Sequence, residues 1–248
     1  FSEMGASRMW IDFDHSVPQW DDILELGFPG MLKRAELFRS LHKTRGTLTP
    51  ETEAFFDGIR ITLEASLRLI ARLRDHARRT ADGNPRVLAV AECLDRLLAG
   101  PPQTTYEALM FDWLVFFFGE HIDRTQVRSL GNLDRLLYPF FQRDVASGRY
   151  TEEQIREFVR YFLMQFAAIA NYWGHPFYFG GTRADGSSEI NPMSHLILDV
   201  FDDLGIMSPK LQIKVSPNTP RDFVDKALDM IRRGHSSIVF CNEPGMMR

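Results

Sequence analysis

The stretch GGTRADGSSEINPMSHLILDV, residues 180–200, indicates the fold class of the chain, because it connects a predicted strand to a predicted helix. A pair of glycines and an Asp-Gly turn follow the aromatic-rich segment NYWGHPFYFGG (171–181), whose flanking glycines are typical of a short strand. Asn191-Pro192 then opens an apolar helical pattern. Ligands of α/β proteins gather where parallel strands end, so this loop could face a site. A plain strand-to-helix connection would also use Gly and Asp for its turns.

The sequence after this loop repeats the same alternation of strand and helix. LQIKVS (211–216) and SIVFC (237–241) are compact β-branched runs, and each is bounded by turn residues. Helical patterns at 191–205 and 220–234 separate the expected strands. Because a strand, helix, strand order requires crossover connections, we predict a parallel sheet or barrel with the helices outside.

The residues before 170 predict helices with local start and stop signals. Gly27 and Pro29-Gly30 interrupt the first helical pattern, and Thr-Pro or Asn-Pro pairs begin the next ones. Two capping boxes are expected, Thr104 with Glu107 and Thr151 with Gln154. We therefore predict a helical region at 1–170 and the first βαβαβ units of an α/β structure at 171–248.

The composition argues against some classes of partner. With 44% hydrophobic and 25% charged residues and a net charge of −4, the chain has no electrostatic reason to bind nucleic acid or a membrane. The apolar run 109–119 is about half of the ~20 residues that cross a bilayer. Two cysteines are too few for a disulfide framework, so a reducing, cytoplasmic setting is expected. The arginines of 68–80 favour a solvated helix face over a binding patch.

Three groups of residues could carry chemistry, and common nucleotide, zinc-protease and serine-hydrolase motifs are absent. IDFDH (11–15) could bind metal. We favour the interpretation that it leads into a helix and places acidic side chains near the helix N-terminus. GEHIDRTQVRSLG (119–131) could line a cavity or form an internal salt-bridge network, and both remain open. Cys241 is a candidate nucleophile, but its apolar strand favours a buried, structural cysteine. Cys93 is expected on the apolar face of a helix, which also favours burial.

Taken together, these segments resemble the glycyl radical enzymes, the pyruvate formate-lyase-like family that includes diol, choline and hydroxyproline lyases. Five elements occur in the family's order, and two positions in the third, Asn132 and Arg135, depart from the usual Arg and Gln. The matching stretches are DHSVPQWDDILELGFPGM (14–31), PPQTTYEALMF (101–111), SLGNLDRLLYPFFQRDVASG (129–148), GGTRADGSSEINPMSHLILDV (180–200), and PKLQIKVSPNTP (209–220) with IRRGHSSIVFCNE (231–243).

The resemblance implies a large helical region and the first strands of a ten-stranded α/β barrel around a buried radical. A separate S-adenosylmethionine radical activase would install that radical on a glycine, and a cysteine inside the barrel would abstract hydrogen from the substrate. Both the Gly-Cys-hydrophobic-Glu motif and the glycyl loop fall outside this chain, so we expect a fragment of a longer protein without catalytic residues, bound cofactor or metal. Cys241 does not take the thiyl role.

By position in the matched elements, four residues are expected to contact a small polar substrate. His15 would be a hydrogen-bond partner or proton relay, Gln126 a polar contact, Val127 a pocket-lining residue, and Phe177 the apolar wall. The expected function is that of a glycyl radical lyase or dehydratase, which would be a homodimer as the full-length protein.

Other functions stay open at this point. A formate acetyltransferase or an arylacetate decarboxylase of the same family is one alternative. An inactive, stand-alone helical binding module is another, because an open sheet edge can pair with a partner. A third is a metal-dependent hydrolase that uses the IDFDH cluster.

Overall fold

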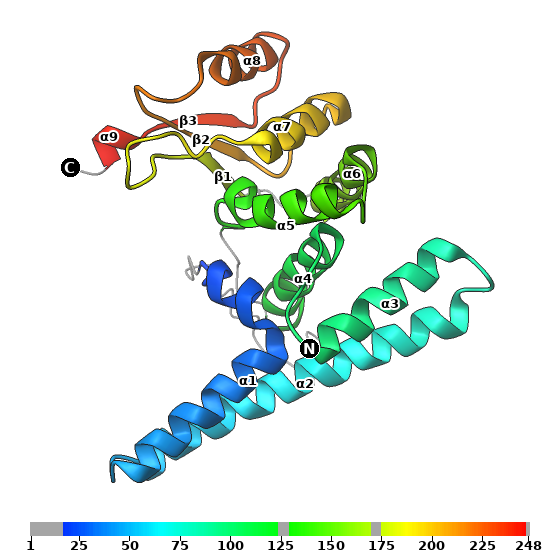
Figure 1. Cartoon of the computed structure of the whole chain (residues 1–248), viewed down its shortest axis with the longest axis vertical. Helices are drawn as coiled ribbons and strands as arrows, with labels where there is room; N and C mark the ends of the chain where they lie inside the picture. Colours follow the sequence, from blue (N-terminus) through cyan, green and yellow to red (C-terminus); the bar gives the residue numbers. More distant parts are fainter. Residues whose placement is uncertain (1–16, 124–128, 170–174, 247–248) are drawn as a thin grey trace, which may run out of the picture. The chain divides into compact units, whose positions relative to one another are not determined.

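The structure, a computed structural model, describes residues 17–123, 129–169 and 175–246. The chain forms two compact units, one made of residues 19–112 and a second that includes 113–246 (Figure 1). The division falls inside helix α4 (Thr105–Phe117), which runs without a break from one unit into the other. The predicted division into 1–170 and 171–248 separates helices from alternating strands and helices, and it stays a prediction.

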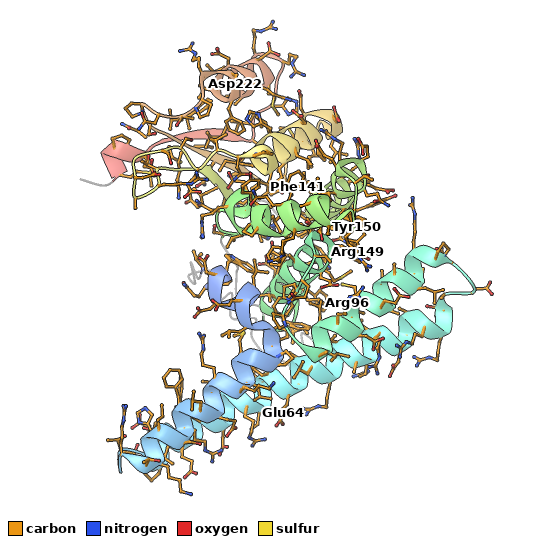
Figure 2. All side chains as sticks on the ribbon, viewed as in Figure 1. Glu64, Arg96, Phe141, Arg149, Tyr150 and Asp222 are labelled. Carbon is orange, nitrogen blue, oxygen red and sulfur yellow. The ribbon has the colours of Figure 1, made fainter. Side chains whose placement is uncertain are left out.

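The first unit consists of long helices: α1 (Trp20–Thr44), α2 (Pro50–Thr80) and α3 (Pro85–Ala99). The predicted break in α1 is confirmed, since Gly27 has a φ of 59° within the helix. A Cβ at this position would lie 2.9 Å from the carbonyl oxygen of Gly100, so only glycine fits. Arg96 on α3, labelled in Figure 2, forms an ion pair with the buried Glu107.

The second unit begins with the end of α4 and the π-helix η1 (Phe118–Asp123). Helices α5 (Leu133–Ser147) and α6 (Glu152–Ile169) follow. The capping box predicted before α6 is confirmed: the Thr151 amide donates to Gln154 Oε1 at 2.9 Å, and the Gln154 amide donates to Thr151 Oγ1 at 3.3 Å.

A three-stranded parallel sheet completes the second unit, in the order β1-β2-β3. Its strands are β1 (Phe177–Gly180), β2 (Leu211–Val215) and β3 (Ile238–Asn242), with α7 (Pro192–Leu204) and α8 (Arg221–Arg232) between them and the short α9 (Glu243–Met246) after them. Phe177 pairs with Leu211, and Leu211 pairs with Ile238. The predicted strand and helix alternation is therefore confirmed.

The two faces of this sheet differ in character. Right-handed crossovers place α7 and α8 on the same face. On that face the fully buried rings of Phe177 and Phe179 lie 5.3 Å apart, and the Phe179 ring lies 6.2 Å from that of Phe223 on α8. Because successive side chains of a strand point to opposite faces, the intervening residues point away from these helices.

Within the described ranges, no helix combines the length and the apolar character that a bilayer crossing requires.

Candidate functional site

The carboxyl end of β1 is held by two side chains at the start of α5. Asn132 Nδ2 donates to the Gly180 carbonyl oxygen at 3.0 Å, and the Gly180 amide donates to Asp134 Oδ2 at the same distance. The Ser194 hydroxyl, on α7, donates to Asp134 Oδ2 at 2.6 Å. Burial raises the pKa of the Asp134 carboxyl, and these hydrogen bonds oppose the shift. The network fixes the chain where the strand gives way to the loop.

The Gly-Gly pair is required by backbone conformation and by space. Gly180 and Gly181 have φ values of 65° and 121°, which residues with a side chain rarely adopt. A Cβ on Gly180 would lie 2.7 Å from Ile190 Cδ1. The next residue, Thr182, donates to the Glu243 carboxylate through its amide at 3.0 Å and its hydroxyl at 2.5 Å. The loop therefore ties the end of β1 to the end of β3.

Polar side chains lie on the sheet face that points away from α7 and α8. Tyr178 is in register with Gln212, and Lys214 is in register with Cys241. The Lys214 ammonium lies 3.0 Å from Asn132 Oδ1 and 5.2 Å from the centre of the Tyr178 ring. Parallel sheets are generally covered on both faces. This face is therefore suited to form the inner wall of a barrel.

The ionisable groups on this face are perturbed by burial. Burial raises the pKa of the Tyr178 hydroxyl and of the Cys241 thiol, and the nearby Lys214 partly opposes the shift at Cys241. A thiol with a raised pKa is mostly protonated at neutral pH and is a poor nucleophile. Cys93 is buried in α3, and burial raises its pKa strongly. Neither cysteine has the surroundings of an activated nucleophile.

An acidic and a basic side chain that lie close together join two segments that are far apart in the sequence. His175 Nε2 lies 3.7 Å from Glu120 Oε1 in η1. The His175 ring is 1% exposed and contacts the rings of Phe116 and Phe166, with centroids 4.6 and 5.5 Å away. Sequence reasoning placed Glu120 in a polar cluster but missed His175, because no local spacing connects them. The pair shows that part of this cluster turns into the core.

The predicted substrate contacts are described only in part. His15, Gln126 and Val127 lie outside the described residues, as does the whole IDFDH segment. Phe177 is described: its side chain is fully buried on the face that packs against α7 and α8. Its predicted contact with substrate stays a prediction. Among the residues that the structure describes, no group of three His, Cys, Asp or Glu side chains could hold a metal ion.

A helical region that leads into parallel βαβαβ units, with polar side chains on the face opposite the helices, defines the opening portion of an α/β barrel. Residues 8–248 match the family described as pyruvate formate lyase-like, and the chain belongs to that family. The recognition made from five short sequence elements is therefore confirmed.

Curated relatives include radical enzymes that act on different substrates. The chain is 25% identical to trans-4-hydroxy-L-proline dehydratase of Clostridioides difficile, over 79% of this chain and 28% of the dehydratase. It is 24% identical to (2S)-3-sulfopropanediol dehydratase of Klebsiella oxytoca, over 98% of this chain and 32% of that enzyme. The chain thus spans about a third or less of the length of these relatives.

Solved structures agree on the fold. A glycyl radical enzyme from Archaeoglobus fulgidus superposes with a TM-score of 0.80 at 23% identity, over 92% of this chain and 32% of that one. Glycyl radical enzymes of this kind fold into a ten-stranded α/β barrel. The present chain corresponds to the helical region and the first strands of that barrel. The predicted fold class is confirmed.

Proposed function

We propose that this chain is part of a glycyl radical lyase that removes water from a small hydroxylated metabolite. The observation that carries the proposal is the family match over residues 8–248 together with the activity of the two relatives reported above, both of which are dehydratases. The alternatives from the same family, a formate acetyltransferase or an arylacetate decarboxylase, differ in reaction but would use the same barrel.

The radical chemistry would come from outside this chain. A glycyl radical, installed by a radical S-adenosylmethionine activase, would take the hydrogen atom of a cysteine thiol and leave the unpaired electron on sulfur, and both residues would lie outside residues 1–248. Such a reaction needs the sulfur and the substrate carbon held in contact in a cavity that excludes water. The role of the present residues is to build one wall of that cavity.

We assign this wall to the sheet face that carries Tyr178, Gln212, Lys214 and Cys241. The assignment is supported by the fixed geometry at the strand ends, where Asn132 holds both Lys214 and the Gly180 carbonyl. Rigid side chains on strands position a substrate better than side chains on a mobile loop. The substrate contacts proposed from the resemblance are His15, Gln126, Val127 and Phe177; of these, Phe177 faces α7 and α8, opposite this wall, so its contact would require a different arrangement from the one described.

The setting of the full-length protein follows from the same proposal. The full-length protein would be a cytoplasmic homodimer that binds its activase and a small-molecule substrate. The net charge of −4 and the presence of only two cysteines are compatible with this setting.

The reading frame beyond Arg248 tests the proposal first. We expect it to encode a Gly-Cys-hydrophobic-Glu motif and, near the C-terminus, a glycyl radical loop. The full-length protein would then be activated anaerobically and incubated with trans-4-hydroxy-L-proline, propane-1,2-diol and 3-sulfopropanediol, and dehydrated products would be measured by mass spectrometry. A stop codon directly after Arg248 would contradict the proposal and favour the stand-alone binding module.

A further inference from the structure

Helix α2 carries a second apolar row outside its packed face. Phe56, Leu63 and Ile70 are buried, as a helix in a hairpin requires. A different row, with side chains four residues apart, consists of Ile61, Ala65, Leu69 and Leu73. Ile61 is 55% exposed and Leu73 is 37% exposed, so the row faces solvent. Residues spaced by four form a ridge that another helix can pack against.

Three cationic or titratable side chains flank this row near its C-terminal end. Arg72, His76 and Arg79 are exposed, and within the described ranges none of them has an ion pair or a hydrogen bond. The other arginines of α2 are paired. Arg60 and Arg68 contact Glu64 (labelled in Figure 2), and Arg74 and Arg78 contact Asp95 on α3. Unpaired arginines are therefore confined to one face.

The two features enclose a shallow hollow of about 320 Å³. Its lining residues are Leu69, Arg72, Leu73, Asp75, His76 and Arg79. Asp75 is the only acidic residue among them, and it accepts a hydrogen bond from Arg74 Nε at 2.8 Å. The hollow thus combines the apolar side chains of Leu69 and Leu73 with two arginines, Arg72 and Arg79, that form no ion pair in the described part of the chain.

We propose that this face of α2 docks an amphipathic helix of a partner protein, with apolar side chains against Leu69 and Leu73 and carboxylates against Arg72 and Arg79. The row from Ile61 to Leu73 extends for about 18 Å, which matches roughly three turns of a partner helix. Arg72 and Arg79 are two turns apart on α2, so the partner would carry carboxylates at positions i and i+7.

A membrane fits this surface less well than a helix does. Helices that lie on membranes present a broad apolar face that often contains Trp or Phe. Here the broad face of α2 is already buried in the hairpin, and the outer row is narrow and contains an alanine. The docking surface does not depend on the proposed lyase function, because it lies in the helical unit and uses none of the residues assigned to the substrate.

The test uses the full-length protein and a stapled helical peptide with Leu at positions i, i+4 and i+7 and Glu at positions i+1 and i+8. Binding would be followed by fluorescence anisotropy at low and at physiological salt. We expect Arg72→Glu with Arg79→Glu to weaken binding at least tenfold, and Leu73→Ser to weaken it several-fold. Replacing Arg221 and Arg232 on α8, which are 83% and 76% exposed, should leave binding unchanged.

Each remaining outcome would overturn the proposal. Equal binding by the charge-reversal variant would show that these arginines do not form the surface. Binding of phosphatidylserine vesicles in place of the peptide would indicate a membrane surface, and a change of molar mass in light scattering on charge reversal would indicate self-association. Because the substituted side chains are exposed, unchanged thermal unfolding of each variant serves as the folding control.

Discussion

Ser194 at the start of α7 donates its hydroxyl hydrogen bond to Asp134 at the start of α5, with 2.6 Å between Oγ and Oδ2. The same carboxylate oxygen accepts the Gly180 amide at the end of β1, and all of these atoms are buried. One carboxylate therefore joins a helix of the predicted helical region to the first strand and the first outer helix of the barrel. The ordering of the loop after β1 depends on this contact.

Replacing Asp134 with Asn should destabilise the protein by about 1–3 kcal/mol. Both carboxylate oxygens accept hydrogen bonds, Oδ2 from Gly180 and Ser194 and Oδ1 from the Arg135 amide, so an amide NH₂ in place of either oxygen would face a donor. Chemical denaturation measures the effect. Asp185→Asn is a matched control: Asp185 also accepts a backbone amide and a hydroxyl, both from Ser187, but it is exposed. We expect it to cost less than about 1 kcal/mol. Equal costs at the two sites would contradict the role of the buried network.

Gly180→Ala should destabilise the protein more than Gly186→Ala. Both glycines have positive φ, so each substitution carries a backbone cost of about 1 kcal/mol. A Cβ at Gly180 would also collide with Ile190, which adds about 1–3 kcal/mol, whereas at Gly186 it would meet nothing within 4 Å. The difference between the two melting temperatures isolates the steric contribution. If both variants melt at the same temperature, the loop does not pack as described.

Asp112 on α4 is a buried carboxyl whose Oδ1 has no hydrogen-bond partner within the described residues. Burial raises its pKa well above the ordinary value. The folded state then holds this proton more tightly than the unfolded state does. The resulting stabilisation is present at acid pH and is lost as pH rises from about 4 through the folded pKa, by about 1.4 kcal/mol per unit.

The variant Asp112→Asn removes this titration, so its stability relative to the parent protein should increase with pH over that range. Urea unfolding of both proteins at several pH values from about 4 to 7 measures the difference. A difference that stays constant with pH would mean that Asp112 remains ionised in the folded protein.

Local signals in the sequence predicted the elements well. The break at Gly27, the Thr151 and Gln154 capping box, and the order of strands and helices after residue 175 depend on neighbouring residues and on short periodic patterns. Because such signals act within one or two turns, a single sequence is enough to reveal them.

Contacts between distant residues could not be predicted in the same way. The pairing of Glu120 with His175 and the donors around Asp134 depend on how elements pack. The division of the chain within α4 has no sequence signal either, because the helix continues through it. Phe177 was singled out for its place in a motif, whereas its direction depends on which face of the sheet the helices cover.

The central claim is that this chain builds part of a barrel whose radical glycine and reactive cysteine lie elsewhere in the same protein. Electron paramagnetic resonance of the full-length protein, after anaerobic treatment with a radical S-adenosylmethionine activase, tests it most directly. The account predicts the doublet signal of a glycyl radical, which should disappear when the glycine of the C-terminal loop is replaced by alanine. A fully activated preparation that gives no organic radical signal would contradict it.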